Sequence, residues 1–443
     1  MMRFGTQTVN SKGHLEIGGC DAVELAERFG TPLYVMDEKL IRQNCRDYLN
    51  GFRSRYARTD IAFAGKAFLT AATCRIMDQE GLGLDVVSAG EVYTALKADF
   101  PMDRLYFHGN YKSEAEIRMA LDKGVGRIVV DSVYELEVLN SLALETGRKA
   151  DILLRLTPGI DPHTHRLIRL GQADTKFGLN VKDGSAMSAV KRALELPGIS
   201  LRGIHCHIGS QLLDTQAHTA AVQIMVEFAR QVLDETGLAI EEINTGGGLG
   251  IRYFEGQQPP TIDQFAADVT GAFIQSLKEF ALPHQPKLVQ EPGRSIVGTA
   301  GTTLYTVGPI KRVPITEEPE YRVYVAVDGG LSDNPRPLLY DAVYQALVAN
   351  KADGEPSQVV TISGKHCEAD TLIQDARIAE VAPGDILAVY CTGAYNYSMA
   401  SNYNRLPRPA AVLVADGEAD VIVERETLDD LVRHDVIPAR LNR

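Results

Sequence analysis

The sequence predicts an α/β protein in which a TIM (β/α)8 barrel is joined to a mostly β C-terminal domain. From residue 61 onward, short and almost entirely apolar runs alternate with segments of helical period. This alternation is typical of parallel strands covered by helices. Eight such units fill roughly 235 residues, close to the size of a closed barrel. A doubly wound open sheet is the alternative, and eight regular units favour closure.

Each expected barrel strand is an apolar run that ends in polar residues or glycine. The eight are 61–66, 83–88, 105–110, 127–132, 151–158, 201–210, 241–248 and 287–294. Helical segments separate them, and Ser113 with Glu116 has the spacing of a capping box at the start of one helix.

The pattern changes after residue 295, where helix signals become few. We expect three parts: residues 1–38 joining the β domain, residues 39–295 forming the barrel, and residues 296–443 forming the C-terminal β domain. Asp416-Gly417 is a strong hairpin signal within this last part. The β-rich segments expected there are 321–330, 357–363, 385–392 and 411–423, and the N-terminal strand is expected at 31–38.

Composition excludes several classes of protein. The 443 residues carry a net charge of −13, which repels nucleic acid and anionic membranes. The chain has no apolar stretch of the roughly 20 residues that span a bilayer, and its first residues lack the apolar region of a signal peptide. The six cysteines are scattered without a Cys-x-x-Cys pair, as in proteins with free thiols. We therefore expect a cytoplasmic protein that binds neither nucleic acid nor membrane.

Polar residues gather where the expected strands end, which is where barrel active sites are built. Lys66 ends the first strand. A lysine there is either a strand end entering solvent or a reactive amine, desolvated so that it can form a Schiff base. The other strand-end residues that we single out are Asp85, Ser88, His108, Asn110, Asp131, Arg155, His207, Ser210, Glu291 and Arg294.

The loops after the seventh and eighth strands read "TGGGLG" and "EPGRS". Barrels commonly bind phosphate at these two loops, and the glycines Gly246, Gly247 and Gly248 would let backbone N–H groups close on phosphate oxygens. A plain tight turn is the alternative. Together with Lys66 and the nearby Glu291, a phosphate cradle supplies the three parts of a pyridoxal phosphate site: an amine, an anchor and an acid for the pyridinium nitrogen.

Two other features need an explanation. His205 and His207, like His163 and His165, have the spacing that places two imidazoles on one face of a strand, which suggests a metal. We predict no metal, because the first strand carries a lysine and the last two strands offer no histidine. His207 would instead stack on a cofactor ring, and for either His205 or His207 the alternative is a hydrogen-bonded core residue. In the β domain, Cys367 stands among acids in "SGKHCEAD", which is unusual for a core cysteine.

In combination, several motifs are similar to those of one family. They are "FAGKAF", "FHGNYKS", "VDSVYEL", "HTHRLIRLGQADTKFG", "HCHIGSQ", "NTGGGLGIRY", "EPGRS", "VDGGLSDNPRPLLYDA", "GKHCEAD" and "TGAYNYSMASNYN". Over nearly its whole length the chain resembles the diaminopimelate decarboxylases, pyridoxal phosphate enzymes that pair an alanine-racemase-like barrel with a β domain.

The resemblance implies roles on the barrel. Lys66 is the Schiff-base lysine, and His207 stacks on the cofactor ring. Glu291 pairs with the pyridinium nitrogen. The phosphate would be held by Ser210, Gly246, Gly247, Gly248, Gly293 and Arg294, together with Tyr395 of the β domain.

It also implies a homodimer with shared active sites. Arg294, Arg336 and Tyr340 would grip the distal carboxylate of the substrate, with Tyr395 beside them. Cys367 and Glu368 would come from the other subunit, the first near the reacting carbon and the second near the distal amine.

The implied reaction is decarboxylation of meso-2,6-diaminopimelate to L-lysine and CO2, the last step of lysine biosynthesis. Two departures, Leu170 and Ala369, stand where the family has hydroxyl residues. They leave open a sister decarboxylase acting on a D-amino acid, carboxynorspermidine or a carrier-linked glutamyl group. A racemase of the same group is a weaker alternative, because Cys367-Glu368 fits a decarboxylase better. A catalytically silent regulator would be expected to have lost Lys66 or the glycine loop.

Overall fold

The computed structural model describes residues 2–160, 175–315 and 321–441. The chain divides into two compact units. One comprises residues 41–252 and 256–296, and the other comprises residues 1–40, 253–255 and 297–443. None of the helices in the described ranges combines the length and the hydropathy that crossing a bilayer requires.

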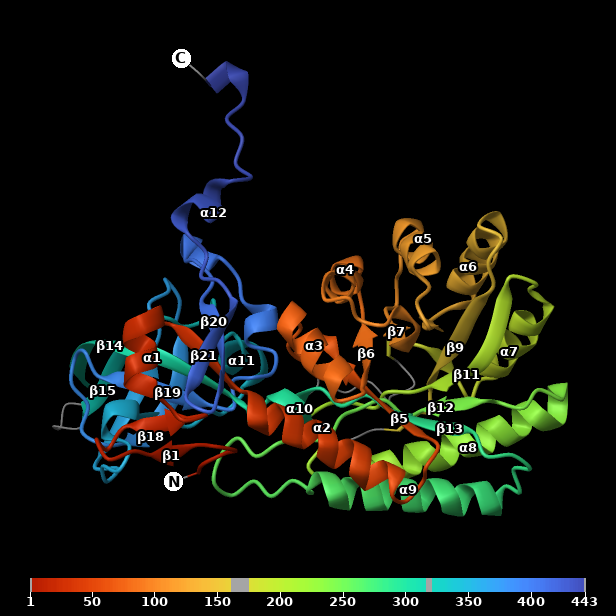
Figure 1. The fold of residues 1–443 in the computed structure, drawn as a ribbon, viewed down its shortest axis with the longest axis horizontal. Coiled ribbons are helices and arrows are strands. Elements are labelled where there is room, and N and C mark those ends of the chain that lie inside the picture. The colour runs from red at the N-terminus through yellow and green to blue at the C-terminus, as the bar shows by residue number, and fades with distance from the viewer. Residues whose placement is uncertain (1, 161–174, 316–320, 442–443) are drawn as a thin grey trace. The chain divides into compact units, whose positions relative to one another are not determined.

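The first unit contains a closed barrel of eight parallel strands (Figure 1). Around the barrel each strand pairs with its neighbour in chain order, and β13 pairs with β5 to complete the ring. The strands are β5 (Thr59–Ala64), β6 (Gly83–Val86), β7 (Leu105–Phe107), β8 (Arg127–Val130), β9 (Ala150–Thr157), β11 (Ile199–His205), β12 (Glu242–Asn244) and β13 (Lys287–Gln290). The short β10 (Leu179–Asn180) adds to β9 outside the ring. The prediction of a closed barrel is therefore confirmed.

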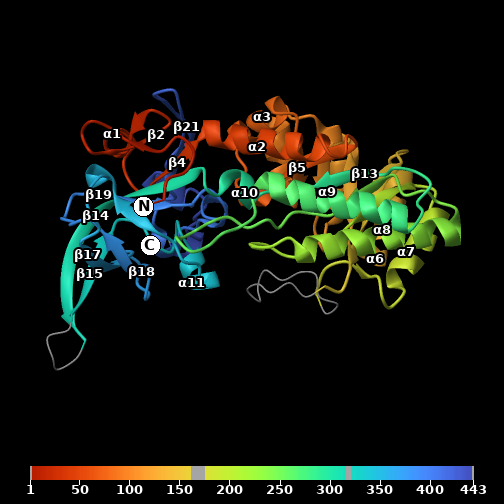
Figure 2. The ribbon, with the colours of Figure 1, turned by 90° about the horizontal axis from the view of Figure 1, so that it is seen from below.

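Helices follow the strands and cover the outside of the ring, with α8 and α9 packed side by side (Figures 1 and 2). The capping box is present at α5: the Ser113 hydroxyl accepts the N–H of Glu116 at 3.3 Å, and the Glu116 carboxylate accepts the N–H of Ser113 at 3.0 Å. The helices are α2 (Glu38–Arg53), α3 (Ala71–Gln79), α4 (Ala89–Lys97), α5 (Glu114–Lys123), α6 (Val133–Glu145), α7 (Ser185–Glu195), α8 (Gln216–Thr236), α9 (Ile262–Glu279) and the single turn α10 (Arg294–Val297).

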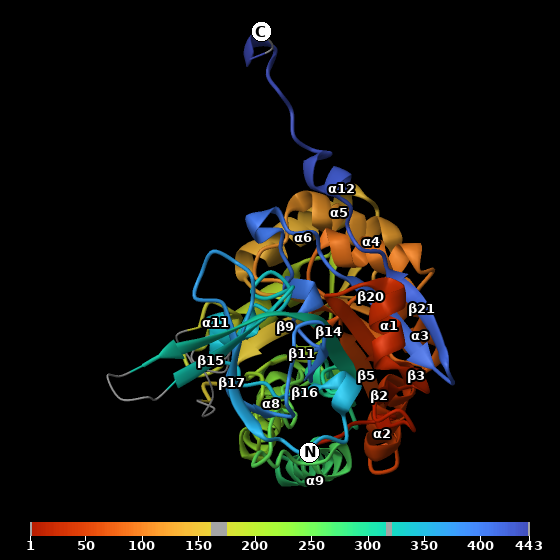
Figure 3. The same ribbon diagram turned by 90° about the vertical axis from the view of Figure 1, so that its left-hand side faces the viewer.

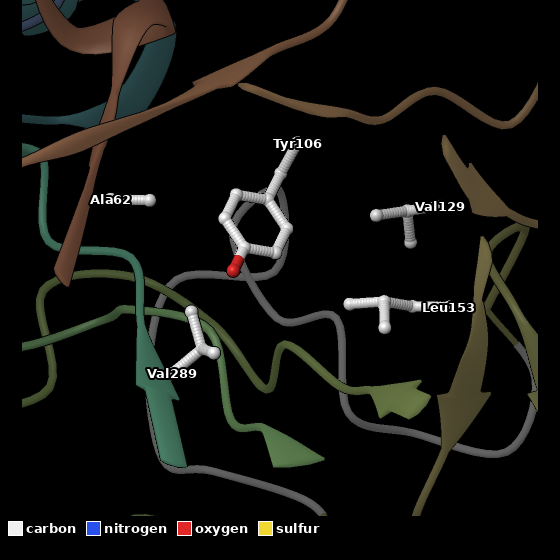
Figure 4. Close-up of a cluster of buried hydrophobic side chains, with 5 residues drawn as sticks. All are labelled: Ala62, Tyr106, Val129, Leu153 and Val289. Carbon is white, nitrogen blue, oxygen red and sulfur yellow. The ribbon is translucent and has the colours of Figure 1, made fainter. Parts of the chain in front are cut away.

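Side chains from five strands fill the barrel interior (Figure 4). They are Ala62, Tyr106, Val129, Leu153 and Val289, all nearly inaccessible to solvent. Each comes from a different strand and alternates with residues that face the helices. The interior is thus a packed core, which gives the loops at the strand ends a rigid base.

The strands end earlier than the sequence predicts. β5 ends at Ala64, so Lys66 lies in a 3-10 turn (Gly65–Ala67) rather than in the strand. The backbone beyond the strands is held by hydrogen bonds between loops: the N–H of Ala64 donates to the carbonyl of Pro292 at 3.0 Å, and the N–H of Glu291 donates to that of Gly246 at 2.8 Å. Residues expected at strand ends therefore stand on ordered loops just above the barrel.

The second unit is mostly β, as predicted (Figure 3). Its centre is the long β14 (Gly301–Pro314), which pairs antiparallel with β4 (Leu33–Asp37), β15 (Tyr321–Val327) and β19 (Ile386–Tyr390). Because β4 lies between β14 and β20, the N-terminal segment completes this domain. Its other strands are β1 (Thr8–Val9), β2 (Leu15–Ile17), β3 (Cys20–Asp21), β16 (Ala346–Val348), β17 (Gln358–Ser363), β18 (Thr371–Ile378), β20 (Ala410–Ala415) and β21 (Glu418–Val423), and its helices are α1 (Ala22–Phe29), α11 (Arg336–Tyr340) and α12 (Leu428–Val432).

The hairpin prediction is confirmed, since Asp416 and Gly417 join β20 to β21 with φ of +52° and +83°. The sequence did not predict β14 or β18. Gly308 and Pro309 interrupt the alternation of β14, and the structure places them at a register shift between Val307 and Ile310. A bulge is where a strand tolerates proline, which lacks the ladder N–H.

Candidate active site

Lys66 lies beside the carboxylate of Asp85. Ala64 of β5 pairs with Asp85 of β6, which brings the lysine turn next to that carboxylate. The Lys66 amine forms an ion pair with it. The Asp85 side chain is fully buried, whereas that of Lys66 is 39% exposed. Lys66 is therefore accessible, and not desolvated as one of the two sequence-based alternatives expected. A buried counter-charge orients its amine.

A buried carboxylate, Glu291, stands at the end of β13 and receives three hydrogen bonds. Its Oε1 accepts from His108 Nε2 at 2.8 Å and from Asn244 Nδ2 at 2.6 Å, and its Oε2 accepts from His205 Nε2 at 3.1 Å. Burial by itself would raise the pKa of Glu291, but the electrostatic attraction and hydrogen bonds of the two imidazoles outweigh it and hold the pKa well below its usual range. Glu291 is thus an oriented anion at neutral pH.

His205 donates to this anion as a neutral ring. Burial lowers its pKa to about 4, and the attraction of Glu291 opposes that shift only in part. The other ring nitrogen, Nδ1, is buried and has no hydrogen-bond partner in the described part of the chain. His205 therefore exists as the Nε2–H tautomer, an assignment that follows from the acceptor it faces.

His207 is held separately from His205. β11 ends at His205, so His207 stands beyond the strand, partly exposed, and its Nδ1 accepts the N–H of Gly247 at 3.4 Å. Burial and then the positive charge of Lys66 hold the pKa of His207 well below its usual value. It offers a flat, uncharged ring at neutral pH.

His205 and His207 have different partners: the first donates to Glu291, and the second accepts from the Gly247 N–H. The ligand atoms of His108, His205 and Glu291 lie within 4.8 Å of one another. Hydrogen bonds from the two imidazoles to the carboxylate account for this cluster without a metal. His163 and His165 lie outside the described residues.

The glycine loop leaves no room for side chains. A Cβ on Gly247 would lie 2.1 Å from the carbonyl oxygen of Glu291, and one on Gly248 would lie 2.6 Å from that of Gly209. Gly246 has a φ of +69° and Gly248 one of +131°. The Gly248 N–H has no acceptor among the described residues. This is the geometry of a loop whose backbone approaches an anion closely.

Arg294 and Ser210 stand at the same end of the barrel as the glycine loop. Arg294 Nη2 donates to Ser210 Oγ at 3.0 Å. Gly293 precedes this arginine, and a Cβ there would lie 3.0 Å from that of Ala64. The turn that carries Glu291 therefore packs directly against the turn that carries Lys66.

These groups fit pyridoxal phosphate. An accessible amine, an oriented carboxylate, a neutral flat ring and a glycine cradle with a nearby guanidinium occur together at one end of one barrel. Asp85 Oδ1 is buried without a hydrogen bond among the described residues, and His108 Nε2 lies 3.7 Å from it.

The β domain carries a second group of the expected site residues. The guanidinium of Arg336 lies over the ring of Tyr340 at 4.8 Å and over that of Tyr395 at 5.5 Å. Arg336 is buried and forms no ion pair within the described ranges. A buried, unpaired guanidinium between two phenols is suited to bind an anionic ligand.

Cys367 and Glu368 stand on an exposed loop with a buried base. The Cys367 N–H donates to Asn404 Oδ1 at 3.0 Å, and the Tyr403 hydroxyl donates to Glu368 Oε1 at 2.7 Å. Beneath them, His366 and Asp370 form a buried pair, with 2.5 Å between Nδ1 and Oδ2. The loop thus presents Cys367 and Glu368 outward from a fixed support. Ala369 is exposed beside them, whereas Leu170 lies outside the described residues.

Sequence reasoning missed three contributors. Asn244 and His205 hold Glu291. Asn244 was given no role, because a buried asparagine in a strand has no distinctive local pattern, and His205 was considered only as a metal ligand or a hydrogen-bonded core residue. Glu91 accepts the N–H of Val87 at 2.7 Å, and burial raises its pKa to about 7. Glu91 stands three residues after the N-cap Ser88, and this spacing is the sequence pattern that could have pointed to it.

Comparison with known proteins identifies the class of protein to which the chain belongs. Residues 39–298 match the family model described as pyridoxal-dependent decarboxylase, pyridoxal binding domain. The chain belongs to the pyridoxal-dependent decarboxylases, and among them to the diaminopimelate decarboxylase family. It is 47% identical to the diaminopimelate decarboxylase of Bacillus subtilis over 98% of both chains, and 43% identical to that of Synechocystis over 98% of this chain and 93% of the relative.

Solved structures agree with this assignment. The diaminopimelate decarboxylase of M. jannaschii in complex with L-lysine matches with a TM-score of 0.91 and 38% identity, covering 98% of this chain and 99% of that one. That of Helicobacter pylori, also with L-lysine, matches with a TM-score of 0.84 and 32% identity over 93% and 98% of the two chains.

Proposed function

We propose that this protein removes one carboxyl group from meso-2,6-diaminopimelate, giving L-lysine and CO2 in the last step of lysine biosynthesis. The observation that carries this proposal is 47% identity to a diaminopimelate decarboxylase across 98% of the chain. When bound, pyridoxal phosphate supplies an electron sink for the pair of electrons left on Cα as CO2 departs.

Lys66 provides the amine that holds the cofactor, and Asp85 orients it. The 3-10 turn places the amine above the barrel, where it is accessible to a ligand. Asp85 is fully buried and forms an ion pair with Lys66, so it would hold the ammonium in place whenever the lysine is not bonded to the cofactor. The ion pair therefore preserves the position of Lys66 through turnover.

Glu291 keeps the ring nitrogen of the cofactor protonated. An ionised carboxylate fixed by three donors presents its negative charge without reorganisation, which is the arrangement that stabilises a developing charge most efficiently. The His207 ring is uncharged, so it can stack on the cofactor ring without repelling the positive pyridinium nitrogen.

The phosphate is held by backbone and cation together. Gly246, Gly247 and Gly248 offer the close approach, and Ser210 with Arg294 offers a hydroxyl and a guanidinium. Both kinds of donor are typical of phosphate sites.

Substrate selection falls to residues of the β domain. Arg336 and Tyr340, with Arg294, bind the distal carboxylate, and Tyr395 reaches the cofactor phosphate. A guanidinium fork fits a planar carboxylate, and a diamino acid such as ornithine has no distal carboxylate to offer it.

Cys367 and Glu368 serve the active site of a second subunit in a homodimer. Their exposure on a supported loop is what favours this arrangement. Cys367, or a water that it orients, would deliver the proton to Cα, and Glu368 would accept the distal ammonium. The enzyme works in the cytoplasm, where its free thiols remain reduced.

The test is a single incubation of the purified protein, loaded with pyridoxal phosphate, with meso-diaminopimelate. L,L-diaminopimelate, D-lysine, D-ornithine and L-ornithine are offered in parallel, and products are read by mass spectrometry. Lysine formed from the meso isomer alone supports the proposal. Consumption of another amino acid without lysine would move the protein to a sister decarboxylase, and no turnover of any substrate would overturn the enzymatic assignment.

A further inference from the structure

A cavity opens at the opposite end of the barrel from Lys66, where the strands begin. It is an open pocket of about 650 Å3 between the loop 54–58, which leads into β5, and the loop 280–286, which leads into β13. One wall is the C-terminal half of α9. The whole pocket belongs to the barrel unit.

Its lining combines apolar side chains with cations. Ile274, Leu277 and Leu282 supply the apolar surface, and the rim carries positive charges. The cations are Arg55, Arg58 and Lys278, and no carboxylate is among the lining residues. In a chain with a net charge of −13, a pocket lined by three cations and no acid is a local reversal of charge.

Two of these cations are not used by the fold. Arg55 is paired with Asp263 at 2.8 Å, which fixes one edge of the pocket. In the described part of the chain, the side chains of Arg58 and Lys278 make neither an ion pair nor a hydrogen bond, and both are exposed. Two available cations beside an apolar surface can accept an anion whose hydrophobic portion is buried at the same time.

We propose that this pocket binds a small amphipathic carboxylate. The volume lies in the range of about 300–1,000 Å3 that is usual for small-molecule sites, and such sites combine apolar walls with a few polar groups that fix orientation. The Arg58 guanidinium donates two parallel hydrogen bonds to the ligand carboxylate, and Lys278 adds a second positive charge. The aliphatic or aromatic part of the ligand packs on Leu277 and its neighbours.

The position gives the ligand a physical consequence. Arg58 is followed directly by Thr59, the first residue of β5, and Pro286 is followed by Lys287, the first of β13. The Tyr56 hydroxyl already joins the two loops by donating to the Pro286 carbonyl at 2.6 Å. A ligand between the loops adds a second connection, so binding raises the unfolding temperature of the barrel.

The test uses the full-length holoenzyme and 6-phenylhexanoate as the probe, with binding measured by calorimetry. We expect one probe per chain and a raised unfolding temperature. The uncharged 6-phenylhexanamide, and the double variant Arg58→Gln/Lys278→Gln, should each weaken binding by at least about tenfold, since two charge contacts are lost. Leu277→Trp fills the pocket and should abolish binding.

Two controls separate this pocket from other places. Lys123→Gln removes an exposed cation elsewhere and should leave the affinity unchanged. Arg336→Gln removes the guanidinium proposed for the substrate carboxylate and should also leave it unchanged. No saturable binding at millimolar probe, or binding that survives both the double variant and Leu277→Trp, would overturn the proposal.

Discussion

Replacing Glu291 by glutamine tests the centre of the proposed site. The substitution keeps the shape and removes the charge. Two donors, from His108 and Asn244, converge on one carboxylate oxygen, so the amide oxygen must take that position. The amide NH2 then faces His205, whose Nε2 donates in the native protein. Because His205 Nδ1 has no partner among the described residues, the ring can move its proton there and accept from the amide.

This rearrangement sets the expected magnitudes. Hydrogen bonds to a charged group weaken to neutral ones, but the cost of burying the charge also disappears, so the free energy of unfolding should fall by only about 1–2 kcal/mol. The loss of a preorganised charge in a buried site should lower kcat by about 10²–10³-fold, that is about 2.7–4 kcal/mol of transition-state stabilisation. The assay is CO2 release from meso-diaminopimelate, alongside urea unfolding of the same samples.

A matched control lies at the other end of the barrel. Glu242 is also a buried carboxylate, and it binds Arg127 with its two oxygens at 2.5 and 3.2 Å. Glu242→Gln leaves that arginine without its main partner, so it should destabilise the fold more than Glu291→Gln while changing kcat little. The reasoning fails if Glu291→Gln keeps kcat within about threefold of the wild type, or if kcat falls equally in both variants.

Four further results are expected. Lys66→Ala should keep native circular dichroism but lose cofactor that borohydride can fix to the protein, and retention of fixed cofactor would argue against this lysine. Glu135→Gln should lower the free energy of unfolding in urea by about 3 kcal/mol, because it leaves the buried Lys112 ammonium, 2.6 Å from Glu135, without its counter-charge. An unchanged midpoint of urea unfolding would contradict this. Cys367, exposed whereas the other five cysteines of the described chain are buried, should be the single thiol that maleimide labels in the native protein, and Cys367→Ser should abolish that labelling and lower kcat. Burial raises the pKa of Glu91 to about 7, above its unfolded value, so its contribution to stability is complete at low pH and is lost as pH rises through 7. Glu91→Gln should remove this pH dependence, which is on the order of 1 kcal/mol between pH 5 and 8. Parallel profiles of stability against pH for the variant and the wild type would refute this prediction.

Regular local patterns explain why much of the barrel could be predicted. Each strand is a short apolar run between polar turns, and the capping box at Ser113 is a purely local device. Strand ends were less accurate, because the residues that follow β5 and β13 are held by hydrogen bonds between loops that are distant in sequence. The long β14 was missed for a related reason: its bulge breaks the alternation, and its three neighbours supply the stability that its own sequence does not indicate.

The sequence by itself determined the chemical parts of this protein: a lysine after the first barrel strand, a glycine loop, an acid after the last strand, and an exposed cysteine among acids. Side-chain type and spacing along the chain are enough for that, because each part depends on residues within one short segment. Only the tertiary structure decided what each part does to its neighbours. It gave Lys66 a buried counter-charge, gave His205 and His207 different partners, and joined His205, His108 and Asn244 on Glu291. Those relations depend on how the ring closes, which pairs β5 with β6, β11 with β12 and β12 with β13, and brings His108 to Glu291 from a more distant strand. The resulting burial and charge shift the pKa values of His205, His207 and Glu291.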